Sequence, residues 1–289
     1  MAEISASLVK DLREKTGAGM MECKKALTQS NGDMEAAIKI LREAGIAKGE
    51  KRAGRTAAEG LIGLSVSADN KTAAIVEFNC ETDFVARNDE FQKVLAALVK
   101  ATLNGKLADA AELARTTLPE YGKAAGEVVG DLLAKIGEKL EITRATTVSG
   151  DYIVGYIHPP GKIGTLIVLT GNVNDASKDA ARGIAMHVAA RQPRFLLESE
   201  IDEKTIATER EIAANIARKE GKPENLIPKI VDGKVKSFAA ENVLLNQEHV
   251  MHPKKTVKAV LAEAAKDVAI SKFVCYRVGE LAAPAPAEA

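Results

Sequence analysis

Residues 79–88 read Asn-Cys-Glu-Thr-Asp-Phe-Val-Ala-Arg-Asn and follow an apolar run, residues 73–76, that is typical of a β-strand. Thr82 and Asp83 are residue types that often cap the start of a helix, so the chain is predicted to turn here from strand to helix. Such a turn holds Phe84 on a short corner. A ring at this position is either a core anchor or a contact residue, and apolar residues beside a strand usually face inward.

Three short helices are predicted before this corner, over residues 5–44. The helical spacing of apolar residues is interrupted by the glycine-containing break at residues 16–19. A second helix is expected over about residues 20–27, and Asp33 is suited to cap the third. The three helices would form a small bundle that resembles a ubiquitin-associated domain, a module that binds other proteins. Residues 48–55 are expected to be a linker or a solvated helix, and residues 1–55 form the first domain.

Two units with the same order of elements, a β-hairpin followed by a helix, are expected after the bundle. The first unit spans residues 56–145 and contains the corner at Phe84. The second unit combines residues 146–198 with residues 240–280 and has its own corner near His158. This repetition predicts a degenerate internal duplication that presents two corners to one partner.

The charged segment of residues 199–239, inserted into the second unit, is predicted to form an antiparallel helical hairpin. Pro223 follows the turn between the two arms and is suited to the first position of the second helix. The apolar residues expected to form its seam are Ile206, Ile212, Ile216, Leu226, Ile230, Val235 and Phe238. The sequence as a whole therefore predicts an α+β protein, with residues 281–289 as a disordered alanine-proline tail.

Charge and cysteine content restrict the classes of function. Forty basic and forty acidic residues balance, so the chain lacks the positive field that holds nucleic acid. Cys23, Cys80 and Cys275 form no paired spacing, which disfavours both a disulfide framework and a zinc ribbon and points to a reducing compartment. Because no targeting segment and no apolar run of about 18 residues is evident, we expect a cytoplasmic chain without a membrane partner.

The loop of residues 155–163 superficially resembles a phosphate-binding loop. Five residues separate its glycines where the motif has four, and Ile163 replaces the hydroxyl residue that holds magnesium. Prolines also remove backbone N–H donors from this segment. The chain is therefore expected to bind no nucleotide itself.

Histidine and cysteine side chains also give little support for catalysis. His249 and His252 lack the cysteine or acidic neighbours that complete a metal site, and His187 is interpreted as a half-buried structural residue. Cys80 beside Glu81 lacks the orienting third group of a thiol enzyme. We expect no cofactor, no metal and no covalent chemistry.

A resemblance to a known family is carried by two ordered motifs. The first runs from Leu-Val-Lys at residues 8–10 to Thr-Gly-Ala-Gly-Met-Met-Glu-Cys-Lys-Lys-Ala-Leu at residues 16–27, and the second is Thr-Asp-Phe-Val at residues 82–85. The likeness continues through residues 155–164, 186–190 and 221–223, so that nearly the whole chain resembles bacterial elongation factor Ts. The C-terminus departs from the family, because several members carry a further helical module there.

The resemblance implies a guanine-nucleotide exchange factor that binds elongation factor Tu and promotes GDP release during translation. It implies that Asp83 and Phe84 enter the partner's GTPase domain near its magnesium ion, while Thr82 and Val85 shape the corner. It also implies secondary partner contacts by Arg13, Met20, Met21, Ile136 and His158.

Several of these assignments have an alternative. Core packing explains Met20 and Met21 equally well, and a buried isoleucine at a strand edge would look the same as Ile136. The helical hairpin is either stabilised by its own seam or used for homodimerisation or for a distal part of the partner. For the whole protein, the alternative function is an adaptor that binds another protein through its N-terminal bundle, and a thiol enzyme at Cys80 is a third class.

Overall fold

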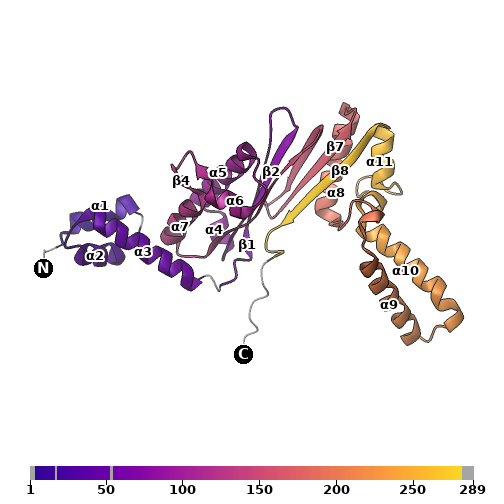
Figure 1. The fold of residues 1–289 in the computed structure, drawn as a ribbon, viewed down its shortest axis with the longest axis horizontal. Coiled ribbons are helices and arrows are strands. Elements are labelled where there is room, and N and C mark those ends of the chain that lie inside the picture. Colours follow the sequence, from indigo (N-terminus) through magenta and orange to yellow (C-terminus); the bar gives the residue numbers. More distant parts are fainter. Residues whose placement is uncertain (1–3, 17, 53–54, 282–289) are drawn as a thin grey trace.

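The computed structural model describes residues 4–16, 18–52 and 55–281 of the chain. Figure 1 shows an elongated molecule with a helical bundle at one end, two sheet-containing units in the middle and a helical hairpin at the other end. This mixture of helices and antiparallel strands confirms the predicted α+β class. The predicted tail falls on residues 281–289, and its residues 282–289 lie outside the described residues. Within the described ranges, no helix has both the length and the apolar character needed to cross a bilayer.

The N-terminal bundle consists of α1 (Ala6–Thr16), α2 (Met20–Gln29) and α3 (Met34–Arg52). Asp33 caps α3, because its Oδ1 accepts a hydrogen bond from the backbone N–H of Ala36 at 2.9 Å. The small core of the bundle is made of Val9, Leu12, Cys23, Ala26, Leu27 and Ala37. Since α3 continues to Arg52, most of the segment that was expected to be a linker or a solvated helix is helical.

The first sheet contains β1 (Glu59–Val66), β2 (Thr72–Cys80) and β5 (Leu140–Ser149), in the order β1-β2-β5, with antiparallel neighbours. After β2, the chain forms the single turn α4 (Asp83–Ala86) and then α5 (Asp89–Gly105). Phe78 on β2 stacks on Phe91 on α5, with their ring centroids 4.3 Å apart. The predicted strand-to-helix corner and the helix that follows it are therefore confirmed.

Residues 106–149 supply elements that the sequence did not reveal. They form α6 (Ala110–Arg115), the short ribbon β3 (Thr117–Leu118) and β4 (Lys123–Ala124), α7 (Ala125–Ile136) and strand β5. Residues of α7 pack into the same core as α5. Ile136 is the last residue of α7, so its interpretation as a strand-edge residue is wrong.

The second sheet contains β6 (Tyr152–His158), β7 (Ile163–Gly171) and β8 (Val268–Arg277), in the order β6-β7-β8. It packs against α8 (Asp175–Arg191) and α11 (Val257–Ala264), and short 3-10 turns lie at η1 (Glu198–Glu200) and η3 (Leu244–Asn246). As in the first sheet, a hairpin supplies two strands and a later segment pairs with the middle strand.

The two sheets are held together by an apolar cluster to which both contribute: Ile62, Ala73, Ile75, Val148, Ile153, Leu166 and Val168. Glycines in the second sheet allow the two sheets to approach each other closely. A Cβ atom at Gly164 would lie 2.5 Å from Ile62, and one at Gly155 would lie 2.4 Å from Leu64. Both distances are too short for carbon atoms, so a side chain at either position would force the facing side chain, or the two sheets, to shift.

The inserted hairpin consists of α9 (Glu203–Lys219), the 3-10 turn η2 (Glu224–Leu226) and α10 (Ile227–Asn242), which confirms the predicted helical pair. Its seam agrees with the prediction in part, because the predicted Ile230 and Val235 pack against it. The buried residues are Ala213, Ala217, Ile227 and Val231, whereas Ile212, Ile216 and Leu226 are exposed. Alanines four residues apart let the helices approach closely, and this turns the neighbouring isoleucines outward. The predicted role of Pro223 is also wrong, because it precedes η2, and Pro228 occupies the first turn of α10.

One buried ion pair ties the residues after β8 to the first sheet. The Nε of Arg144 on β5 donates to Oε2 of Glu77 on β2 at 2.6 Å, and Glu77 is completely buried. The other Glu77 oxygen accepts from the backbone N–H of Gly279 at 2.9 Å. Arg144 also donates to the carbonyl of Arg277 at 2.9 Å and to the carboxylate of Glu280 at 3.0 Å. The pair is thus surrounded by the additional hydrogen bonds that a buried ion pair requires.

Candidate protein-contact site

The corner between β2 and α4 presents an aromatic ring to solvent. Thr82 is the N-cap of α4, and its Oγ1 accepts from the backbone N–H of Val85 at 3.5 Å. Val85 and Ala86 point into the core of the first unit. This leaves Phe84 on the outer side, with 80% of its surface exposed. The interpretation of Phe84 as a core anchor is therefore wrong.

Asp83 places a charged acceptor next to this ring. Its Oδ2 accepts from Nη2 of Arg87, one turn later on the helix, at 2.8 Å. The Arg87 side chain is largely exposed and the Asp83 side chain partly so. Ion pairs between such exposed groups contribute little stability, so a competing donor can displace Arg87 at low cost.

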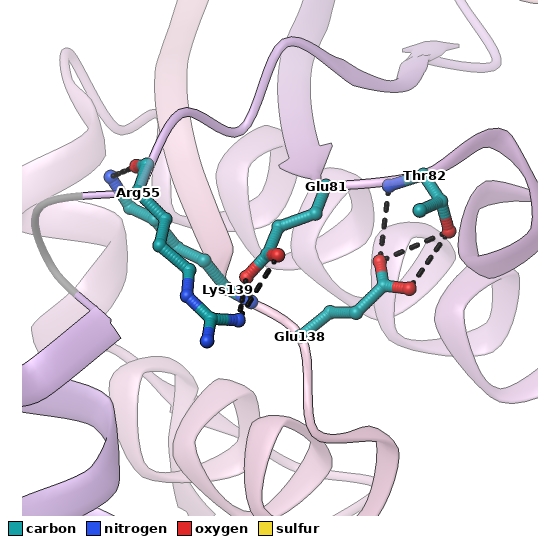
Figure 2. Close-up of polar contacts among 5 residues, drawn as sticks. All are labelled: Arg55, Glu81, Thr82, Glu138 and Lys139. Carbon is teal, nitrogen blue, oxygen red and sulfur yellow. Dashed lines mark hydrogen bonds and ion pairs between the residues drawn. The ribbon is translucent and has the colours of Figure 1, made fainter. Parts of the chain in front are cut away.

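Two carboxylates hold the corner (Figure 2). Glu138, in the loop between α7 and β5, accepts from the backbone N–H of Thr82 at 3.0 Å and from its hydroxyl at 2.8 Å. Glu81 accepts from the backbone N–H of Lys139 at 2.6 Å. We call Glu81 and Glu138 the carboxylate clamp, because each reaches across to the backbone of the opposite segment.

The clamp also contacts the segment that leads from the N-terminal helices to β1. Nη1 of Arg55 lies 3.3 Å from both carboxylate oxygens of Glu81. Nζ of Lys139 donates to the backbone carbonyl of Arg55 at 3.1 Å. Glu81 therefore joins three parts of the chain that are distant in sequence.

The N-terminal candidate residues lie on a different surface. Met20 and Met21, at the start of α2, are 47% and 75% exposed, and Arg13 on α1 is exposed as well. Core packing therefore does not explain the two methionines. A helix end that carries two exposed methionines is typical of an adaptable contact surface.

The remaining two candidates lie in the two sheet units. Ile136 is half-buried against the first core and precedes Glu138 by two residues, so the clamp brings it close to the corner. His158 is the exposed last residue of β6, and its Nδ1 is 2.8 Å from the hydroxyl of Tyr156. Glu138 could not be recognised as a functional residue from the sequence, because its partner Thr82 lies 56 residues away and no local pattern marks the contact.

Cys80 does not have the environment of a reactive thiol. Burial, followed by the charges of Glu138 and Glu59, raises its pKa from 9.0 to about 12. Its Sγ donates to the carbonyl of Thr82 at 3.1 Å. Cys80 stays protonated near neutral pH and supports the corner structurally.

His187, His249 and His252 form a packed cluster. His187 is fully buried, whereas a half-buried position was predicted, and both its ring nitrogens have partners: Gln247 at 2.8 Å and the N–H of Val250 at 3.2 Å. His249 stacks on His187, with ring centroids 5.3 Å apart. Across residues 4–16, 18–52 and 55–281, no group of three or more histidine, cysteine or acidic side chains is arranged to hold a metal.

His249 is expected to make the fold sensitive to acid. Burial, followed by the nearby His187 and His252, lowers its pKa from 6.5 to about 4. The unfolded chain therefore takes up a proton near pH 6.5 and the folded chain only near pH 4, so stability is lost as the pH falls through this interval. Between about pH 7.5 and pH 5 the loss amounts to roughly 2 kcal/mol. Urea unfolding of the wild type and of His249→Phe across this pH range measures the loss of stability. An equally steep pH dependence in both proteins would contradict its attribution to His249.

Comparisons of the chain with a family model and with individual proteins indicate the same family. A family model described as Elongation factor TS matches residues 81–280, a range that begins at the corner. The chain is 45% identical to Elongation factor Ts of a Nitratiruptor species, across 96% of this chain and 93% of that protein. It is 47% identical to Elongation factor Ts of Sinorhizobium fredii and 44% identical to that of Rhizobium meliloti, in each case across 92% of this chain and 88% of the relative.

These matches place the chain among the translation elongation factors. Within that class it belongs to the elongation factor Ts family.

Proposed function

We propose that this chain is a guanine-nucleotide exchange factor that binds elongation factor Tu, both with GDP and without nucleotide, and promotes GDP release. Family membership supports the proposal, and one structural observation carries it: Phe84 is exposed on a corner that backbone and carboxylate contacts hold in place. Exposure of an aromatic ring to water is unfavourable. A fixed and exposed ring is therefore expected where a partner buries it.

The mechanism requires no covalent chemistry from this chain. The partner holds GDP through a phosphate-binding loop and a magnesium ion, and this arrangement is sensitive to small displacements of the surrounding groups. Phe84 supplies volume and Asp83 supplies a charged acceptor at the point of insertion, while Thr82 and Val85 fix the corner. The factor is thus not an enzyme in the covalent sense.

Thermodynamic reciprocity limits how the corner can act. If the exchange factor weakens GDP binding by a given ratio, GDP weakens the binding of the exchange factor by the same ratio. Contacts that are equally favourable in the GDP-bound and the empty partner do not shift the equilibrium between these two states. Phe84 and Asp83 must therefore make contacts that form mainly in the opened state of the partner.

The direct test is the release of a fluorescent GDP from elongation factor Tu in the presence of excess unlabelled nucleotide. Acceleration by catalytic amounts of this chain supports the exchange function. No acceleration at any concentration would leave the adaptor function as the better proposal.

We further propose that Arg13, Met20 and Met21 on the bundle, with Ile136 and His158, form secondary contacts to the partner. Met20→Ala combined with Met21→Ala should raise the factor concentration for half-maximal exchange by about tenfold, with the maximal rate unchanged, because uniform binding is lost. Titration of the exchange rate measures both quantities.

Glu35→Gln, an exposed change on the neighbouring helix α3, is the control for the methionine variant. A lower maximal rate in the methionine variant would contradict a purely binding role. Complete loss of partner binding would favour the adaptor function.

A homodimer through the helical hairpin is a separate proposal, supported by the exposed Ile212, Ile216 and Leu226. These side chains lie outside the alanine-rich seam and are accessible to a second copy. Sedimentation equilibrium measures the oligomeric state directly, and a monomer at micromolar concentration would contradict the proposed homodimer.

A further inference from the structure

We infer that Glu138 is a positioning residue for the exchange site, because it fixes the corner that carries Phe84. This inference rests on the proposed function and extends it to a residue that does not touch the partner. Glu138 acts through Thr82, whose backbone N–H and hydroxyl both donate to its carboxylate.

The position of the Phe84 ring depends on the backbone that carries it, because the exposed ring packs little against the core. Helix α4 has four residues, and so short a helix does not hold its own geometry in water. The direction of the ring is therefore determined by the contacts at the two ends of this single turn. At the C-terminal end these are the buried Val85 and Ala86, and at the N-terminal end they are the contacts of Thr82.

The carboxylate clamp continues the register of the sheet beyond its last backbone pair. Strands β2 and β5 are antiparallel, and their final pair is Cys80 with Leu140. The next positions in this register are residue 81 opposite 139 and residue 82 opposite 138. At these positions the side chain of Glu81 accepts from the N–H of Lys139, and the side chain of Glu138 accepts from the N–H of Thr82. Side-chain oxygens thus replace the ladder carbonyls, so β2 can turn into α4 while its backbone remains bound to the neighbouring segment.

Glu138 also orients the helix cap. The hydroxyl of Thr82 donates to Glu138 at 2.8 Å, so its lone pairs are left for the N–H of Val85 at 3.5 Å. Hydrogen bonds to an ionised carboxylate are stronger than those between neutral groups. The long cap bond to Val85 is therefore the weaker contact, and Glu138 is the principal fixed point at this end of the corner.

Exchange kinetics with a double-mutant cycle test the inference. Glu138→Ala should lower the maximal rate of GDP release by roughly tenfold, since misplacing a positioned group by about 1 Å costs up to about a hundredfold. The concentration for half-maximal exchange should change by less than about twofold, because no partner contact is removed. In a Phe84→Ala background, Glu138→Ala should have almost no further effect, because the ring through which it acts is absent.

Two further variants separate positioning from general stability. Glu138→Gln retains an oxygen that accepts from Thr82 and should recover most of the rate. Glu127→Gln, an exposed acid in the first turn of α7, should leave the rate unchanged. An equal loss of rate from Glu138→Ala in the presence and absence of Phe84 would overturn the inference, as would a wild-type rate for Glu138→Ala.

Hydrogen exchange in the free protein gives a readout that does not depend on GDP release. The backbone amides of residues 82–86 should exchange faster in Glu138→Ala and Glu138→Gln than in the wild type, with the larger increase in Glu138→Ala. Unchanged hydrogen-exchange rates in both variants would show that Glu138 does not fix the backbone of the corner. If the clamp is confirmed but the wild type does not accelerate GDP release, the proposed function has failed, and the assignment of Glu138 to an exchange site fails with it.

Discussion

Phe84→Ala is expected to lower the maximal rate of GDP release from elongation factor Tu by about 30-fold or more while leaving the fold intact. A ring buried at the centre of a contact typically contributes about 2 kcal/mol or more, and each 1.4 kcal/mol corresponds to about a factor of ten. The melting temperature should stay nearly unchanged, because the ring is 80% exposed in the free protein. Since the ring acts mainly in the opened state of the partner, the rate should fall more than the affinity does.

Tyr121→Ala is a matched control, because Tyr121 is another exposed aromatic residue of the first unit. It should leave the exchange rate unchanged. Phe84→Leu, which keeps part of the volume, should give an intermediate rate. A large drop in melting temperature for Phe84→Ala would show that the ring supports the fold, and a normal rate would remove Phe84 from the mechanism.

Removal of one partner of the buried Glu77–Arg144 ion pair is expected to produce the largest loss of stability. Arg144→Met should lower the free energy of unfolding by about 3–5 kcal/mol, because it leaves the fully buried Glu77 carboxylate without its counter-charge. The effect is amplified because the same guanidinium also binds the carbonyl of Arg277. Urea denaturation monitored by circular dichroism measures the loss.

Two comparisons make this prediction specific. Lys100→Met breaks an ion pair with Glu120 in which both side chains are exposed, and should have a far smaller effect. The double variant Glu77→Leu with Arg144→Met should recover part of the loss, because no uncompensated charge remains. Equal stability of Arg144→Met and Lys100→Met would contradict the structural role of the buried pair.

Elements with a strong local pattern could be predicted from the sequence. The helix that begins after Asn88 is one example, because Asn88 caps it through the N–H groups of Glu90 and Phe91 and its apolar residues recur at helical spacing. The strand-to-helix turn at Thr82 is another, because cap residue types are restricted by their hydrogen bonding. Both features are specified within a few residues of the chain.

Features that depend on distant contacts could not be predicted in this way. The outward direction of Phe84 follows from the inward direction of Val85 and Ala86, which local periodicity does not determine. Large apolar residues were predicted to form the seam of the helical hairpin. On its first helix, α9, the buried seam residues are instead Ala213 and Ala217, because small side chains allow the two helices to approach closely. The assignment of residues 82–85 to a partner contact therefore remains a prediction from the sequence, whereas the contact between Glu138 and Thr82 became evident only in three dimensions.

The order of the strands has a consequence for the growing polypeptide during synthesis. The first sheet is complete once β5 has emerged, because its three strands lie within residues 59–149. The second sheet needs β8, which is separated from β7 by the whole helical hairpin and begins only at residue 268. Since units fold from the N-terminus as they leave the ribosome, the first unit is expected to form early and the second only after the helical hairpin and β8 have also been synthesised. The bond from Gly279 to Glu77 can form only after β8 has been made, so the buried Glu77 carboxylate of the early first sheet acquires this partner late in folding.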